Sequence, residues 1–332
     1  MEPAEAQPAG EQQPARQPLV SVIVVSYNVK DLLLDCLAAL FQRTDVPFEA
    51  IVVDNASADG SADAAEAEFP QVKVHRVRKN VGFGRAANIG LAETSGRFVL
   101  VLSPDVMVSE GCLGELADFL LVRPDAGAVG PRIIQPDGSL DPGSRRAFPT
   151  PSVAFYRFAG LSRLFPHSPR FGRYNMGHLS SEQTHEIDAG SAACLMFRRA
   201  ATNKVGFFDP AYFMYGEDID LCYRLKQGGW KIFFVPAAEA FHIHGASSRQ
   251  VKGKALYEYH NALWTFHHKH FADELPAFGN GLFWAAIWTH WVALAGWGAA
   301  NQLASRARAA APAGPVGPAG PAGPLAPPGT ET

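Results

Sequence analysis

Three acidic side chains lie close together in an otherwise apolar stretch, MYGEDIDLCYRL at residues 214–225; they are Glu217, Asp218 and Asp220. A carboxylate in apolar surroundings is costly unless it is paired, binds a metal or is poised to take a proton. If this stretch begins a helix, the helix N-terminus favours acids. Arg224 follows Asp220 by one helical turn and can pair with it. We therefore expect Asp220 to be structural and Asp218 to carry chemistry, with Glu217 beside it.

Two further acids follow apolar runs that are typical of buried strands. Asp54 ends the apolar part of residues 48–61, and Asn55 comes directly after it. An acid at this point can accept a hydrogen bond from a ribose hydroxyl or a base N–H, whereas a helix-capping loop is the structural alternative. Asp105 follows the run at 97–106 in the motif LSPDV. A hard divalent cation prefers such an oxygen ligand, and a simple turn is the alternative.

A glycine-rich loop and a histidine pair complete the candidate residues. The loop KNVGFGRAANIG at 79–90 can bring backbone N–H groups and Arg85 close to a phosphate, although ordinary loops before helices look similar. His242 and His244 in FHIHGASS lie on one side of a predicted strand. They could bind a metal or a phosphate, and His242 is the preferred candidate over a purely structural histidine.

The elements that must position these residues alternate between strand and helix. Strands are expected at 18–28, 48–54, 72–77 and 97–106, and helices at 31–44 and 84–94. This alternation predicts an α/β domain with a Rossmann-like, mainly parallel sheet flanked by helices. Ligands bind at the carboxyl ends of the strands in such sheets. The polar loops after these strands should therefore meet at one edge.

The overall composition excludes some classes of protein. The 332 residues carry 29 basic and 32 acidic side chains, a formal net charge of -3, which gives no electrostatic reason to expect nucleic acid as a partner. The 4 cysteines are far apart and include no C-x-x-C pair. We expect free thiols rather than a zinc site or a disulfide framework.

The two ends of the sequence differ from its middle. Residues 1–18 are rich in Pro, Ala, Gln and Glu, lack the features of a secretory signal and are expected to be disordered, as is the Pro/Gly/Ala-rich tail at 304–332. Residues 281–300 are almost wholly apolar and rich in tryptophan. An interfacial helix is favoured over a true membrane span or a packing helix. We therefore assign 272–303 to an apolar, membrane-associated helical segment.

In this order the motifs resemble the family-2 glycosyltransferases with the GT-A fold. The resemblance covers residues 19–271 and is strongest to the rhamnosyltransferase-like branch, which builds bacterial cell-surface polysaccharides. The matching motifs are SVIVVSYN, IVVDNASADGS, NVGFGRAANIG, LSPDV, VGFFDPAYFMYGEDIDLCYRLKQGGW and FHIHGAS. Two positions depart from the family pattern. Ser103 replaces the first acid of the DxD-type metal motif, and Ala87 stands where some relatives have arginine.

The resemblance implies how a nucleoside-diphosphate sugar would be bound. Asp54 matches the acid that contacts the nucleotide base, and Asn80 and Gly82 match the loop that closes around the nucleotide. Rhamnose is the sugar that the branch suggests. Together with their neighbours in the motifs, the residues assigned to nucleotide-sugar binding are Asp54, Asn55, Asn80, Gly82, Arg85 and Ser103.

The resemblance also implies an inverting, metal-dependent transfer. Asp218 matches the general base, with Glu217 beside it, while Asp105 and His242 match positions that hold Mg²⁺ or Mn²⁺ and the diphosphate. The acceptor would be a glycan or a lipid-linked molecule at the cytoplasmic face of the inner membrane. A catalytically inactive nucleotide-sugar-binding or scaffold protein is the main alternative. A nucleotidyltransferase would need a glycine-rich, basic loop after the first strand, where this sequence reads SYNVKD.

Overall fold

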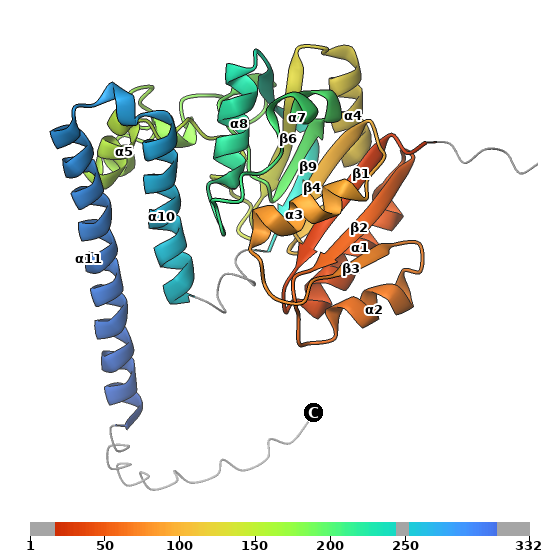
Figure 1. The fold of residues 1–332 in the computed structure, drawn as a ribbon, viewed down its shortest axis with the longest axis horizontal. Coiled ribbons are helices and arrows are strands. Elements are labelled where there is room, and N and C mark those ends of the chain that lie inside the picture. The colour runs from red at the N-terminus through yellow and green to blue at the C-terminus, as the bar shows by residue number, and fades with distance from the viewer. Residues whose placement is uncertain (1–16, 244–251, 311–332) are drawn as a thin grey trace, which may run out of the picture. The chain divides into compact units, whose positions relative to one another are not determined.

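Four parallel strands and the helices between them form the first part of the chain (Figure 1). The computed structural model describes residues 17–243 and 252–310. The strands are β1 (Val20–Ser26), β2 (Phe48–Asp54), β3 (Lys73–Arg76) and β4 (Phe98–Leu102), and they lie in the order β3-β2-β1-β4. The helices are α1 (Lys30–Arg43), α2 (Ser61–Glu68) and α3 (Phe83–Ala92). The strands and helices predicted from the sequence are confirmed here.

The second half of the sheet is mixed rather than parallel. β8 (Cys194–Arg198) lies antiparallel between β4 and β6 (Ala126–Ile134), and β6 pairs in parallel with β9 (Lys231–His242). The short strands β5 (Val106–Val108) and β7 (His185–Ile187) run antiparallel to β9. The predicted α/β class holds, and the parallel part of the sheet is the part that shows regular strand–helix alternation in the sequence.

Strand alternation divides the core into two layers, one on each face of the sheet. In β1, Val22 and Val24 face α1, α2 and α4 (Cys112–Val122), whereas Ile23 and Val25 face α3 and α8 (Glu217–Gln227). This follows from the two-residue repeat of a strand, in which successive side chains point to opposite faces. The remaining helices are α5 (Pro151–Phe158), α6 (Leu161–Leu164), η1 (Arg173–Asn175), α7 (Arg199–Val205), α10 (Lys252–His270), η2 (Ala272–Glu274) and α11 (Ala277–Ala310).

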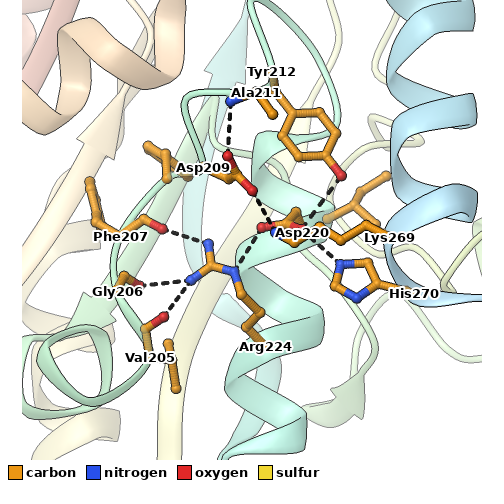
Figure 2. A network of polar contacts seen from close by, with 12 residues as sticks. Val205, Gly206, Phe207, Asp209, Ala211, Tyr212, Asp220, Arg224, Lys269 and His270 are labelled. Carbon is orange, nitrogen blue, oxygen red and sulfur yellow. Dashed lines mark hydrogen bonds and ion pairs between the residues drawn. The ribbon is translucent and has the colours of Figure 1, made fainter.

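Asp220 joins α8 to the end of α10, as Figure 2 shows. Its carboxylate is fully buried and accepts hydrogen bonds from Arg224 Nε at 2.7 Å, Lys269 Nζ at 2.7 Å and His270 Nε2 at 2.8 Å. Arg224 also donates to the carbonyl oxygens of residues 205–207. The structural role predicted for Asp220, with Arg224 as its partner, is confirmed.

The chain separates into two compact units, one ending at Trp291 and one beginning at Val292. In the first unit α10 contacts the start of α11, where His260 Nε2 lies 2.9 Å from His290 Nδ1. Within the described residues, no helix combines the length and apolar character needed to cross a membrane. The predicted lead at 1–18 falls almost wholly outside the described residues. The part of the predicted tail at 304–332 that follows Ala310, where α11 ends, also lies outside the described residues.

The 4 cysteines are free and buried, as predicted. His244, the second histidine of the predicted pair, lies outside the described residues.

Candidate active site

A cavity of about 530 Å³ lies at the carboxyl ends of the parallel strands. Residues that follow β1, β2, β3 and β4 all contribute to its lining, which is the arrangement expected of a ligand site in an open α/β sheet. Eight of the residues predicted from the sequence line this one cavity: Asn55, Asn80, Gly82, Ser103, Asp105, Glu217, Asp218 and His242. Asp54 and Arg85 lie outside its lining.

Asn55 connects two of the loops that form the cavity wall. Its Nδ2 donates to Asn80 Oδ1 at 3.1 Å, and its Oδ1 accepts from the backbone N–H of Val81 at 2.9 Å. Asn80 Oδ1 also accepts from the backbone N–H of Gly82 at 3.0 Å. The two amides therefore fix the conformation of residues 80–82, which the sequence predicted to lie against the nucleotide.

Gly82 allows this loop to approach the segment before α8. Its φ is +88°, and a Cβ atom at this position would collide with the backbone oxygen of Phe213. The same oxygen accepts a hydrogen bond from the backbone N–H of Phe83 at 2.9 Å. A side chain larger than hydrogen is therefore disfavoured on both conformational and steric grounds, because it would force Phe213 to shift.

Asp54 and Arg85 have different surroundings. Asp54 is buried at the end of β2, where its Oδ2 accepts from the backbone N–H of Ser57 at 3.2 Å. Its Oδ1 is buried and has no hydrogen-bond partner in the part of the chain that the structure describes, so this atom retains the capacity to accept from a ligand. Arg85 is exposed and donates through Nε and Nη2 to the carbonyl oxygen of Pro210, at 3.2 and 3.1 Å.

Asp105 and His242 meet at one corner of the cavity. Antiparallel pairing of β5 with β9 places Val106 opposite His242, so Asp105 is adjacent, and His242 Nε2 lies 3.5 Å from Asp105 Oδ1. On its other side, His242 Nδ1 lies 2.6 Å from Asp141 Oδ2. Burial lowers the pKa of His242, but its interactions with Asp105 and Asp141 outweigh this effect and raise the pKa to about 9.

Asp218 forms a buried ion pair with a residue far away in the sequence. Its Oδ2 accepts from Arg146 Nη2 at 2.5 Å and from the backbone N–H of Ala192 at 3.2 Å. Arg146 is held in place because its own backbone pairs with that of Ala189 in both directions. Burial acts to lower the pKa of Arg146, yet the negative charge of Asp218 raises it above the ordinary range. Asp218 is thus held against a permanent positive charge.

Glu217 begins α8 and faces the same cavity with one carboxylate oxygen unused. Tyr215 and Gly216 precede it in consecutive left-handed conformations, with φ of 69° and 81°. For Tyr215 this conformation is strained. Glu217 Oε2 is buried without a hydrogen-bond partner among the described residues. Burial, together with the negative charge of Asp218, raises the pKa of Glu217 to about 8.

Aromatic side chains form the part of the cavity next to these two acids. Phe213 and Tyr215 line it together with Tyr259 and Phe266 of α10. Lys254 Nζ lies 3.6 Å from the centroid of the Phe213 ring, a cation–π contact. One face of α10 therefore contributes to the site, which the sequence did not indicate.

Two charged residues of the site, Asp141 and Arg146, were not assigned a role from the sequence. Both belong to the turn-rich segment that follows β6, and both line the cavity. Long irregular segments in compact domains are often functional, and this was the available signal. It could not identify their partners, because Asp141 and His242 are 101 residues apart and Arg146 and Asp218 are 72 residues apart.

Comparison with known proteins identifies the sequence family. The model of glycosyl transferase family 2 matches residues 21–206. The chain is 33% identical over 260 residues to the N-acetylglucosaminyl-diphospho-decaprenol L-rhamnosyltransferase of Mycobacterium tuberculosis, covering 75% of this chain and 83% of that protein. It is 28% identical over 183 residues to the rhamnosyltransferase WbbL of Escherichia coli K12, covering 53% of this chain and 66% of that protein.

A solved structure has the same fold. The mannosyltransferase PcManGT from Pyrobaculum calidifontis, in complex with GDP-Man and Mn²⁺, is similar with a TM-score of 0.54 and 17% sequence identity. The similarity covers 90% of this chain and 84% of that chain. The GT-A fold predicted from the sequence is therefore confirmed. The chain belongs to glycosyltransferase family 2, in its rhamnosyltransferase-like branch.

Proposed function

We propose that this protein transfers rhamnose, with inversion, from a nucleoside-diphosphate sugar to a lipid-linked acceptor. The acceptor hydroxyl oxygen attacks the anomeric carbon, and the bond from that carbon to the diphosphate breaks. The diphosphate leaves with the electron pair, and the hydroxyl proton passes to Asp218. The observation that carries the proposal is the placement of two neighbouring acids on the cavity wall with different partners: Asp218 pairs with Arg146, and Glu217 has a buried carboxylate oxygen without a partner among the described residues.

The acids have complementary roles in this proposal. The Arg146 guanidinium lies 2.5 Å from Asp218 Oδ2 and supplies a positive partner for this buried side chain, which would accept the proton of the acceptor hydroxyl. Burial and the charge of Asp218 raise the pKa of Glu217 to about 8, so in this proposal Glu217 would carry a proton at neutral pH. A protonated carboxyl group can donate a hydrogen bond to a sugar oxygen. Together they would orient the acceptor hydroxyl and remove its proton.

The donor would lie across the ends of the parallel strands. Asn55, Asn80 and Gly82 supply a fixed loop for the nucleotide. Asp54 Oδ1 has no partner among the described residues, but it is buried outside the cavity lining and would reach the base only after the loop moves. Ser103 lines the same cavity. Arg85 would reach a phosphate only after it leaves Pro210, to which it is bonded.

The corner formed by Asp105 and His242 would hold a divalent cation that displaces a proton from His242, whose pKa is raised to about 9. One carboxylate oxygen and one imidazole nitrogen lie 3.5 Å apart on the cavity wall. No cluster of three or more metal-binding side chains occurs among the described residues. A hard cation that takes its remaining ligands from substrate phosphates and water needs no more than this. Mg²⁺ or Mn²⁺ bound here would stabilise the negative charge that develops on the departing diphosphate.

The lipid-linked acceptor suggests that the protein works at a membrane surface. The Mycobacterium tuberculosis relative is named for a diphospho-decaprenol substrate, and Phe278, Leu282 and Trp284 on α11 are 77%, 56% and 49% exposed. Replacing these three residues with serine should reduce sedimentation with phospholipid vesicles. Replacing the exposed Leu121 and Val122 of α4 is the matched control. Equal sedimentation of both variants and the wild type would contradict membrane contact through α11.

The proposal is tested by assaying the purified chain with Mn²⁺, a polyprenyl-diphosphate-linked sugar acceptor and a panel of nucleoside-diphosphate sugars. We expect a rhamnosylated product whose anomeric configuration, measured by NMR, is opposite to that of the donor. Thymidine diphosphate-rhamnose is the first donor to try. Donor binding without transfer or hydrolysis for every member of the panel would instead favour the inactive nucleotide-sugar-binding protein.

A further inference from the structure

Asp141 contacts one ring nitrogen of the imidazole that the proposed metal corner uses. Asp141 is 5% exposed, lies on the cavity wall and places Oδ2 2.6 Å from His242 Nδ1. The opposite ring nitrogen, Nε2, points to Asp105 Oδ1 at 3.5 Å. The three side chains therefore form a chain of contacts from Asp141 to His242 to Asp105.

The loop around Asp141 keeps its carboxylate in a fixed orientation. Oδ1 accepts from the backbone N–H of Gly143 at 2.6 Å, and the backbone N–H of Asp141 donates to the carbonyl oxygen of Ile133 at 2.8 Å. Gly143 is close to this carboxylate, since a Cβ atom there would lie 3.1 Å from Oδ1 and 3.2 Å from Ser191 Cβ. With Oδ1 bound to the backbone, Oδ2 is directed at the histidine.

This geometry selects one tautomer of His242. An ionised carboxylate only accepts hydrogen bonds, so the contact at 2.6 Å requires a proton on Nδ1. In the neutral ring the lone pair then lies on Nε2, the nitrogen nearest Asp105. A carboxylate that orients a histidine in this way is a recurring feature of metal sites, where it fixes the ring and increases its basicity as a ligand.

We propose that Asp141 is the positioning residue that holds His242 in the orientation and tautomer needed to bind a divalent cation together with Asp105. This inference rests on the proposed function, because it assumes that the Asp105–His242 corner binds the cation. It assigns a role to the irregular segment after β6, which brings Asp141 into contact with His242 at the end of β9. Asp141 itself would not contact the cation.

The test measures Mn²⁺ binding to the full chain by electron paramagnetic resonance, with thymidine diphosphate present at one fixed concentration. For Asp141→Asn we expect the apparent dissociation constant for Mn²⁺ to rise by about 10- to 100-fold, with partial recovery in Asp141→Glu. Asp137→Asn is the matched control, because Asp137 lies in the same loop and accepts from Ser139 N and Oγ. It should bind Mn²⁺ as the wild type does.

The outcomes separate the two claims. Wild-type affinity in a folded Asp141→Asn variant would overturn the role of Asp141 and leave the metal corner in place. A wild type that binds no Mn²⁺, or that binds it as well after Asp105→Asn, would overturn the metal corner and the role of Asp141 with it.

A second measurement uses the wild-type chain and so does not depend on how well the variant folds. Nitrogen-15 NMR of the metal-free protein at high pH, with His242 assigned by comparison with His242→Gln, should show the proton of the neutral ring on Nδ1. A proton on Nε2 would contradict the proposal.

Discussion

Two acids on the same helical turn of α8, Asp218 and Asp220, differ in the partners that the protein supplies to their carboxylates. Asp220 is fully buried, and its carboxylate is bonded to Arg224, Lys269 and His270 (Figure 2). Asp218 has one guanidinium partner and faces the cavity, next to a Glu217 carboxyl group that has an unused oxygen. Similar burial thus produces different chemistry, because the protein supplies all of the partners in one case and leaves room for a ligand in the other.

The same contrast appears in the titration of these acids. Burial acts to raise the pKa of Asp220, but hydrogen bonds from His270 and Lys269 and the charge of Arg224 hold it at about 2. Burial and the charge of Asp218 raise the pKa of Glu217 to about 8. A buried acid with many cationic partners therefore has a structural role. A buried acid without them has a raised pKa and an oxygen that can bind a ligand.

The largest expected effect on stability comes from Asp220→Asn. It leaves Arg224 and Lys269 without their buried counter-charge, so the free energy of unfolding should fall by about 3–5 kcal/mol in urea titrations at neutral pH. The folded-state pKa of Asp220, about 2, lies below the ordinary value of 3.8, so the stability it provides is present above the ordinary value and lost as pH falls through about 2. The difference in the free energy of unfolding between Asp220→Asn and the wild type should therefore shrink as the pH falls toward about 2. A constant difference down to that pH would contradict the network.

Glu217→Gln should have the opposite pH dependence. The folded-state pKa of Glu217, about 8, lies above its ordinary value of 4.5. The folded protein therefore binds more protons than the unfolded chain between these values, and wild-type stability falls as pH rises through this range. Relative to wild type, the Gln variant should gain up to about 1.4 kcal/mol for each pH unit. Parallel urea-unfolding curves for the two proteins at every pH would show that Glu217 is ionised in the fold.

Gly82→Ala tests the cavity wall that faces these acids. The alanine must adopt the positive φ of Gly82 and displace Phe213, at a cost of about 1–3 kcal/mol. We expect KM for the donor to rise because residues 80–82 shift, with a smaller change in kcat. Gly138→Ala, at a positive φ with open space around it, is the control for conformational strain alone. Equal donor KM values for the two variants would mean that the Gly82 loop does not touch the nucleotide.

Arg85→Ala should have the smallest effect. Arg85 is exposed and bonded to the carbonyl oxygen of Pro210, so its loss should cost about 0.5–1 kcal/mol. Donor KM should change less than about 3-fold if Arg85 keeps this contact in the donor complex. An increase above about 10-fold would mean that Arg85 moves to the phosphates, as its place in the glycine-rich loop suggests.

The parts of the molecule that follow local patterns could be predicted from the sequence. The apolar runs that end at Asp54 and Asp105 predict buried strands, and their parallel order brings the polar loops to one edge of the sheet. The motif order also predicts the GT-A fold. Eight of the predicted site residues then line one cavity, because each lies in a loop that follows a strand or precedes α8.

The pairings within the site could not be predicted in the same way. Asp141 and Arg146 come from a segment without helical or strand periodicity, and their partners lie on distant elements. The charge state of Glu217 depends on burial and on the neighbouring Asp218, which only the folded chain determines. For the same reason, the sequence identified Arg85 as a basic residue in a glycine-rich loop but did not indicate its contact with Pro210.

The most direct test of the division between the two acids is the initial rate of sugar transfer by Asp218→Asn and Asp220→Asn, measured side by side per mole of folded protein. We expect Asp218→Asn to lose about 10²- to 10⁴-fold in rate while it binds the donor nearly as the wild type does. Asp220→Asn should stay within about 3-fold of wild type at a temperature where it is folded. Wild-type transfer by Asp218→Asn, or equal losses in the two variants, would contradict the assignment of Asp218 as the base.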